Sequence, residues 1–195
     1  NKKIVCLTDR DPERKKKEGK YNFQKCYPFE FNCDSSIFEY QNNLSLNKYK
    51  PGTHPNIALF SQDAILGRTF EYDLILANPT LELLITESMV NASEMKTLMK
   101  LYDDEEPLSK FLEELRKSDE NKRIVNSINL NTTWTEDQKI KSIIAARYLN
   151  SVGKGENALE LAYVLEENLM KKGTAEYKEF TVPDYIKDAI EWICI

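Results

Sequence analysis

Residues that form zinc sites and disulfide bonds are scarce in this sequence. It has one histidine, His54, and four cysteines with no Cys-x-x-Cys pair among them, at positions 6, 26, 33 and 194. This scarcity excludes the ligand spacing of a zinc site and is typical of reduced cytoplasmic thiols. The sequence also lacks an apolar run near the roughly 20 residues that span a membrane, and it lacks a signal-peptide core. We therefore expect a cytoplasmic protein with no membrane partner.

The chain carries little excess charge of either sign. Its 27 basic and 32 acidic residues give a net charge of −5 over 195 residues. A mildly acidic chain is not expected to bind nucleic acid over its whole surface, so a DNA-binding surface must be local. The length suffices for one well-packed domain, or for one domain with an appended piece. Because the sequence opens on Asn1 without an initiating methionine, we expect it to be a piece of a longer protein.

The pattern of apolar residues changes near residue 78. Before it, the apolar segments are short, β-branched and bounded by proline, glycine or asparagine. This pattern predicts strands of an α/β sheet at residues 3–8, 56–61 and 69–76. After it, helix signals dominate. Asn78-Pro79 and Glu106-Pro107 each predict a helix start, because proline suits the first helical turn.

Further helix boundaries lie in the second half of the chain. They are a capping box, an amphipathic run between two glycines and a final proline start, at residues 135–138, 153–173 and 183. No internal repeat or low-complexity tract interrupts the chain. We expect the segment from about residue 79 to 150 to be a helical insertion or subdomain.

Two aspartates follow the first predicted strand. Ile4–Leu7 is a continuous apolar run, typical of a parallel strand buried on both faces, and Asp9 and Asp11 lie beyond its carboxyl end. Ligands of open α/β sheets bind at that end. Neighbouring carboxylates repel each other unless a cation neutralises them, and hard oxygen ligands favour Mg²⁺ or Mn²⁺. The alternative is a polar turn in which aspartate caps a helix that begins at Pro12.

A second acidic pair lies in the third predicted strand. If residues 69–76 form a strand, its period of two places Glu71 and Asp73 on one face. The sheet would then carry two carboxylate pairs. The alternative is a half-exposed strand with ordinary polar residues facing outward.

A lysine between two glycines, Gly153-Lys154-Gly155, precedes a predicted helix. Glycines allow a close approach of the backbone to a ligand, and a helix N-terminus favours an anion, so this turn suits a phosphate. No Walker A motif occurs anywhere in the chain. The alternative is a helix-helix turn with an incidental lysine.

Four short segments occur together in a specific order. They are the strand with TDRDP, TFEYDL, GKGENA and FTVPDYIKDAIEW, at residues 4–12, 69–74, 153–158 and 180–192. This order, and the T-D-R-D-P wording above all, resembles the C-terminal Toprim region of overcoming-lysogenization-defect (OLD) family nucleases. The resemblance implies an α/β fold with a Toprim-like parallel sheet, truncated at its N-terminal part, a helical insertion and C-terminal helices. The implied parts are a Toprim-like core, the insertion, and the K-G motif helix with a C-terminal helix that returns to the core, at residues 1–78, 79–150 and 151–195.

The resemblance also implies roles for single residues. Asp9 and Asp11 match the Toprim D-x-D motif, and Glu71 and Asp73 match the later acidic motif, which makes these four the implied metal ligands. Lys154 matches the lysine of the K-G motif and is the implied catalytic residue. The family's glutamate motif would fall before the first residue. We therefore expect this fragment to lack at least one metal ligand and to cleave DNA poorly by itself.

A basic run supplies the local positive charge that DNA binding needs. It consists of Arg10, Arg14, Lys15, Lys16, Lys17 and Lys20. Such residues contact the DNA backbone without reading its sequence. The predicted phosphate contacts are Arg10, Arg14, Lys15, Gly153 and Gly155. The alternative, above all for Lys16 and Lys17, is a solvated helix start or a loop.

The resemblance implies a metal-dependent DNA endonuclease or nickase. Its cofactor is Mg²⁺ or Mn²⁺, and two such ions about 3.5–4 Å apart can activate a water and stabilise the departing oxygen. Lys154 would then stabilise charge in the transition state. An ABC-type ATPase domain upstream in the same protein is the implied partner besides DNA, ATP acts only through that domain, and a homodimer is left open.

Two other classes of protein stay open. One is a phosphatase of the haloacid dehalogenase type, in which the first aspartate of a D-x-D motif is the nucleophile. That motif usually continues with threonine or valine, whereas Pro12 follows Asp11 here. The other is a non-catalytic interaction module with a Toprim-like sheet.

Overall fold

A computed structural model describes residues 2–153 and 155–194. The chain is a mixed α/β protein with a small parallel sheet, and it divides into two compact units. The first unit contains residues 1–74, 127–134 and 182–195, and the second contains residues 75–126 and 135–181. The last helix thus belongs with the N-terminal strands. The division of the chain at residues 78 and 150 stays a prediction.

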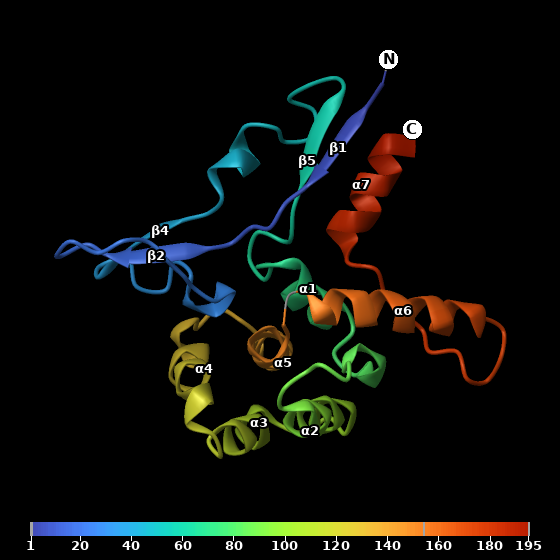
Figure 1. The fold of residues 1–195 in the computed structure, drawn as a ribbon. Coiled ribbons are helices and arrows are strands. Elements are labelled where there is room, and N and C mark those ends of the chain that lie inside the picture. The colour runs from blue at the N-terminus through green and yellow to red at the C-terminus, as the bar shows by residue number, and fades with distance from the viewer. Residues whose placement is uncertain (1, 154, 195) are drawn as a thin grey trace. The chain divides into compact units, whose positions relative to one another are not determined.

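The first unit contains a parallel pair of strands, as predicted. β1 (Ile4–Leu7) pairs with β5 (Ile57–Phe60), with Ile4 opposite Ile57 and Leu7 opposite Phe60. Helix α7 (Asp184–Cys194) packs along both strands (Figure 1). The prediction that β1 is buried on both faces is wrong, since Ile4 is 54% and Leu7 52% exposed. The reason is that, among the described residues, this sheet has two strands and one covering helix.

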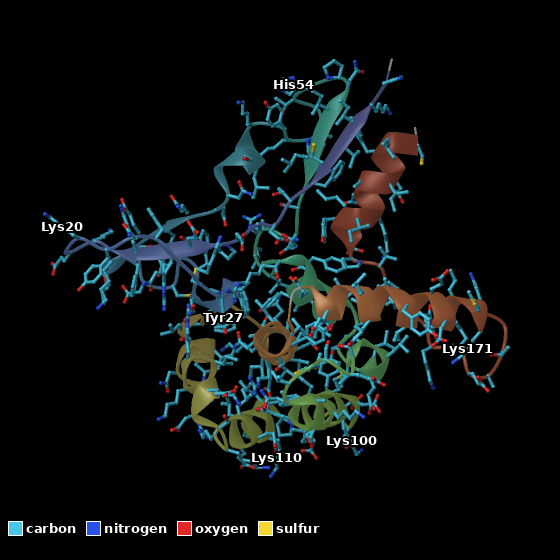
Figure 2. All side chains as sticks on the ribbon, in the orientation of Figure 1. Lys20, Tyr27, His54, Lys100, Lys110 and Lys171 are labelled. Carbon is cyan, nitrogen blue, oxygen red and sulfur yellow. The ribbon has the colours of Figure 1, made fainter. Side chains whose placement is uncertain are left out.

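A second, antiparallel sheet of the first unit contains three residues of the basic run, Arg14, Lys15 and Lys16. Its central strand is β2 (Glu13–Lys16), which lies between β3 (Gln24–Lys25) and β4 (Phe38–Gln41). We call residues 13–41 the hairpin arm, and Lys20 is labelled near its end in Figure 2. Residues 14–16 therefore lie in a strand. The alternatives of the sequence analysis, a helix start or a loop, are wrong for these three residues.

Aromatic rings hold the basic strand in place. The Arg14 guanidinium lies 4.6 Å from the centre of the Phe38 ring, and Lys15 Nζ lies 4.7 Å from that of Phe23. Such cation–π contacts explain why a lysine-rich segment adopts a strand here. Three short helices complete the unit, η1 (Pro28–Glu30), η2 (Leu44–Asn47) and η5 (Ile128–Leu130).

Residues 69–76 do not form the predicted strand. They lie largely in helix α1 (Phe70–Ala77), which begins in the first unit and ends in the second. The alternation of Phe70, Tyr72 and Leu74 suggested a strand, but the run continues with Ile75 and an eight-residue apolar segment does not distinguish helix from strand by period. Tyr72 and Leu74 are 0% and 1% exposed, and residues two apart point to different sides of a helix, so the helix is enclosed on more than one side.

The second unit is helical, as predicted. Its helices are η3 (Glu82–Leu84), α2 (Ala92–Asp103), α3 (Leu108–Leu115), η4 (Asp119–Asn121), α4 (Lys122–Ser127, whose last residue belongs to the first unit), α5 (Glu136–Ser151) and α6 (Glu156–Met170). The capping box at Thr135 and Gln138 is confirmed, and α5 packs against α2 and α3.

The predicted helix start at Asn78-Pro79 is wrong. The first long helix after it is α2, which begins at Ala92. The Asn78 side chain cannot cap a helix because it pairs with the backbone of Thr181: Nδ2 donates to the carbonyl at 2.8 Å, and Oδ1 accepts from the amide at 2.8 Å. The side chain of Asn78, the predicted N-cap, is thus bound to a distant segment of the same unit.

Candidate functional site

Three polar side chains and one backbone amide of the first unit lie near the point where the parallel strands end. Asp9 follows β1, Gln62 follows β5, Phe70 begins α1 and Tyr185 lies in the first turn of α7. The carboxyl ends of parallel strands are where α/β proteins place their ligands. The prediction that Asp9 lies at this edge is confirmed.

Asp9 is held in place by two hydrogen bonds. Its Oδ1 accepts from Gln62 Nε2 at 3.0 Å and from the backbone amide of Phe70 at 3.0 Å. The carboxylate thereby satisfies an amide of the first turn of α1, where negative charge is favourable. Burial nevertheless raises the pKa of Asp9, and the charges of Asp11 and Glu71 raise it further, while the two hydrogen bonds lower it.

Gln62 connects the loops that carry the acidic residues. Its side chain is only 3% exposed, and its Oε1 accepts from the Arg10 amide at 2.7 Å. A Cβ at Gly67 would lie 2.4 Å from the Gln62 Cβ and 2.6 Å from the Asp63 amide nitrogen, so the turn between Asp63 and Gly67 closes tightly on this side chain. Gln62 therefore positions both Asp9 and the backbone next to it.

Asp73 is the most strongly perturbed carboxyl of the site. It is 8% exposed, and its Oδ1 accepts from the Arg68 amide at 3.0 Å. Burial raises the pKa of Asp73 to about 7, against the hydrogen bond from Arg68, and the charges of Asp63 and Asp9 add to the rise. A carboxyl that titrates near neutrality inside a polar cluster is typical of functional sites.

Tyr185 completes the cluster. Burial raises the pKa of Tyr185 to about 12, a hydrogen bond with Gln62 lowers it, and the charges of Asp73 and Asp9 raise it. The phenol therefore keeps its proton at neutral pH. A cavity of about 480 Å³ opens beside it, lined by Leu7, Thr8, Asp9, Gln62, Phe70, Tyr185 and Ile186.

The structure does not join the four predicted metal ligands into one set. Asp11 has a left-handed backbone, with φ of 47°, and its carboxylate pairs with Lys25 at 3.1 Å. Glu71 is half-buried in the first turn of α1. Within residues 2–153 and 155–194, no three histidine, cysteine, aspartate or glutamate side chains form a group that could hold a metal ion.

Asp9 and Asp73 are still suited to a hard cation. Both take their hydrogen bonds on Oδ1, which leaves Oδ2 of each for another partner. Each carboxyl also has a raised pKa, so a bound cation would relieve a real cost of burial. Mg²⁺ is commonly held by one or two carboxylates, with waters and substrate phosphates as its other ligands. The chemistry of this pair therefore fits Mg²⁺ or Mn²⁺.

Two of the predicted phosphate contacts are already neutralised by carboxylates. Arg14 Nη2 lies 3.1 Å from Glu30, whose side chain is fully buried, and Lys15 Nζ lies 2.7 Å from Glu39. Both cations would have to leave these partners to reach a phosphate. Arg10, by contrast, lines an open cavity of the first unit.

The glycine-flanked turn belongs to the second unit. A side chain added at Gly153 or Gly155 would meet open space, so neither glycine is required by packing. Lys154 lies outside the described residues, and its catalytic role stays a prediction.

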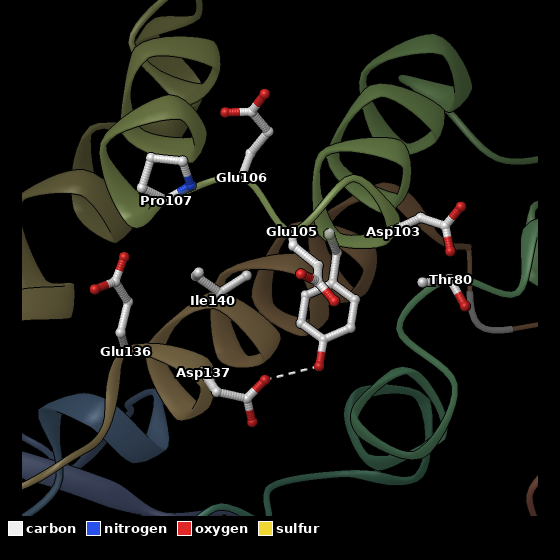
Figure 3. A pocket seen from close by; sticks show the side chains of 9 residues that line it. Thr80, Asp103, Glu105, Glu106, Pro107, Glu136, Asp137 and Ile140 are labelled. Atoms are coloured by element: carbon white, nitrogen blue, oxygen red, sulfur yellow. Dashed lines mark hydrogen bonds between the residues drawn. The ribbon is translucent and has the colours of Figure 1, made fainter.

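A cavity of about 610 Å³ in the second unit has the wrong charge for a phosphate. Figure 3 shows the carboxylates around it and the hydrogen bond from Tyr102 Oη to Asp137 Oδ1, at 2.7 Å. Five of its lining residues are acidic: Asp103, Glu105, Glu106, Glu136 and Asp137. A polyanion such as DNA would be repelled here. The cluster of the first unit is also acidic, but a cavity with Arg10 and Lys50 lies beside its loop and the pKa of Asp73 is raised to about 7, so that cluster is the better candidate.

Comparison with models of known families, with characterised proteins and with solved structures found no match to this chain. The likeness to OLD-family Toprim regions therefore stays a prediction from the four sequence segments. No helix in the described part of the chain is long and apolar enough to cross a membrane.

The sequence analysis missed Gln62 and Tyr185. Gln62 directly follows the second predicted strand, so the rule that drew attention to Asp9 applied to it too. Because the Gln62 side chain is an uncharged amide, nothing else in the sequence marked it as a candidate site residue. Tyr185 has no local signal at all, since its position depends on how α7 packs against β1 and β5.

Proposed function

We propose that this chain is the catalytic part of a metal-dependent DNA endonuclease or nickase with a Toprim-like fold. The observation that carries the proposal is the pair of half-buried Asp9 and buried Asp73, two carboxyls with raised pKa values near the carboxyl end of the parallel strands. The order of the four sequence segments supports the same reaction. The proposal also includes an ABC-type ATPase domain upstream in the same protein. ATP would act only through that domain.

In this mechanism Asp9 and Asp73 would hold a divalent ion, with Asp11 and Glu71 close enough for their charges to act on Asp9. Mg²⁺ or Mn²⁺ supplies Lewis acidity and makes a bound water easier to deprotonate at neutral pH. The protein keeps Asp9 in one orientation through Gln62 and the first turn of α1. The charge of Asp9 also acts on Asp73, so the two carboxyls are electrostatically coupled before any substrate binds.

Tyr185 is the hydrogen-bond donor that this mechanism offers to a phosphate oxygen. Because its pKa is about 12, the phenol donates and does not repel the anion at neutral pH. The adjoining cavity has apolar walls at Leu7, Phe70 and Ile186, which suit the sugar or base next to the scissile bond. Lys154 is proposed to stabilise the charge that develops on the phosphorus oxygens.

Metal binding by the purified chain tests the proposal directly. We expect Mn²⁺ to bind the parent chain in isothermal titration calorimetry at pH 8, and binding to be lost in Asp9→Asn. Asp103→Asn, which changes a carboxylate of the acidic cavity in the second unit, is the matched control and should bind like the parent. Equal binding by the parent and Asp9→Asn would remove Asp9 from the ligand set.

A cleavage assay then separates the proposed reaction from its alternatives. The protein with its upstream ATPase domain should nick supercoiled plasmid with Mg²⁺ or Mn²⁺, and Asp9→Asn should abolish nicking. A phosphatase would instead hydrolyse a phosphomonoester such as p-nitrophenyl phosphate, and an interaction module would turn over neither substrate.

A further inference from the structure

A second cavity of the first unit, of about 360 Å³, lies beside the loop that carries Asp9. Its polar lining comes from Arg10, Asn42, Asn43, Lys50 and Ser61. We propose that this cavity binds one phosphate group of a DNA strand whose neighbouring phosphodiester lies at the Asp9 cluster. The inference deepens the proposed function and rests on it for the identity of the ligand as DNA.

The charge of the cavity is the first argument. Two cationic side chains, Arg10 and Lys50, line one small space. Neither forms an ion pair within 4 Å in the part of the chain that the structure describes, whereas Arg14, Lys15 and Lys25 of the hairpin arm all do. The charges of Asp63 and Asp73 act on Arg10 without forming such a pair. Two cations that line one cavity and have no ion-pair partner favour an anion there, and Arg in particular suits the oxygens of a phosphate.

The side-chain amides of the cavity are the second argument. Asn43 is fully committed: Oδ1 accepts from the Ser45 amide, and Nδ2 donates to Thr8 Oγ1 and to the Asp9 carbonyl. Asn42 is half-buried, and its Oδ1 is a buried atom without a hydrogen-bond partner in the described part of the chain. An asparagine amide can rotate to exchange its oxygen and nitrogen, so Asn42 can present a donor to a phosphate oxygen.

Two sets of hydrogen bonds join the cavity to the acidic cluster. The Arg10 amide donates to Gln62, which in turn donates to the Asp9 carboxylate. Asn43 Nδ2 donates to the carbonyl of Asp9 at 3.1 Å. The wall of the cavity and the loop that carries Asp9 are therefore linked by hydrogen bonds, and a phosphate held by Arg10 would place its neighbour in the strand near Asp9.

The size of the cavity limits its ligand. A volume of about 360 Å³ is at the lower end of the range for small-molecule sites, about 300–1,000 Å³. A cavity of this size suits a ligand no larger than about one nucleotide. A phosphate of a strand and a free phosphate share this chemistry, so the experiment must compare both.

The test is a titration of the metal-free chain, in EDTA, followed by NMR. The ligands are a short single-stranded oligonucleotide, as a source of strand phosphates, and inorganic phosphate. We expect the oligonucleotide to shift the backbone amide signals of Arg10, Asn43 and Ser61. Its affinity should fall about tenfold in Arg10→Gln and in Lys50→Gln, the loss expected for one charge-assisted hydrogen bond.

Lys48→Gln is the matched control, because Lys48 is an exposed neighbour whose Nζ lies over the Tyr49 ring and outside the cavity lining. It should bind like the parent. Lys50 is exposed, so Lys50→Gln should fold normally even if Arg10→Gln does not. Asp9→Asn should bind the oligonucleotide at least as well as the parent, which separates this inference from failure of the metal site.

Three results would overturn the inference. The first is an equal loss of affinity in Lys48→Gln and Lys50→Gln. The second is a set of shifted signals confined to the hairpin arm. The third is inorganic phosphate binding as tightly as the oligonucleotide, which would identify free phosphate as the ligand and not a DNA strand.

Discussion

Replacing Asp73 by asparagine should stabilise the protein at alkaline pH and leave its stability almost unchanged at acidic pH. Asparagine has nearly the shape of aspartate, and its Oδ1 can still accept the Arg68 amide that now lies 3.0 Å from Asp73. What the change removes is a buried negative charge. The sign follows from the direction of the shift, because a carboxyl with a raised pKa holds its proton more tightly in the folded state than in the unfolded chain.

The magnitude follows from the pKa of Asp73, which is about 7 in the fold against an ordinary value of 3.8. Each pH unit between these values lowers the free energy of unfolding by about 1.4 kcal/mol, and above pH 7 the loss stays constant. Between pH 5 and pH 8 the parent should therefore lose about 2–3 kcal/mol through this carboxyl. Asp73→Asn should gain that amount at pH 8 relative to pH 5.

Urea unfolding at the two pH values measures this difference. Both tryptophans, Trp134 and Trp192, belong to the first unit, so their fluorescence follows the unit that contains Asp73. Asp184→Asn is the control, since Asp184 is in the same unit and its side chain is 90% exposed. A stability difference between Asp73→Asn and the parent that is equal at pH 5 and pH 8 would refute the buried, proton-holding carboxyl.

Three further predictions test other parts of the site. Under the proposed function, Lys154→Ala in a protein extended to the proposed upstream ATPase domain should lower cleavage by about 10²–10³-fold with little change in DNA affinity or thermal unfolding, and an unchanged rate would make Lys154 incidental. Mn²⁺ affinity, measured by calorimetry, should fall about tenfold per pH unit below pH 7, because protons compete for Asp73; a flat profile would contradict its role as a ligand. Gly67→Ala should lower the urea midpoint and Mn²⁺ affinity, because its Cβ would lie 2.4 Å from that of Gln62, whereas Gly153→Ala, which meets open space, should change neither.

Local patterns predicted the elements that depend on local chemistry. The strands at Ile4–Leu7 and Ile57–Phe60, and the helix after the capping box at Thr135, follow from apolar runs and side chains that act within a few residues. The strand predicted at residues 69–76 was wrong partly because the helix found there depends on a hydrogen bond with a residue far away in the sequence. The Phe70 amide is satisfied by Asp9, which lies 61 positions away in the sequence.

The site shows the same division. Asp9 was found because its place at a strand end can be read from the sequence, but the burial of Asp73 cannot. That burial arises from the turn that Gly67 allows and from the packing around α1. The predicted pairing of Glu71 with Asp73 rested on a period of two, and in a helix residues two apart point to different sides. The two acidic residues were thus assigned an incorrect geometry, and their role as metal ligands stays a prediction.

The hydrogen bonds of Asp9 limit how it can bind a cation. Its Oδ1 is needed by Gln62 and by the first turn of α1, so metal binding through Oδ1 would cost structure. Oδ2 can bind a cation without that cost, and the same holds for Oδ2 of Asp73, whose Oδ1 accepts the Arg68 amide. Two single oxygens cannot fill the coordination sphere of Mg²⁺, which needs six ligands in near-octahedral geometry. Under the proposed function, waters and the phosphodiester must supply the rest, so the substrate itself completes the site.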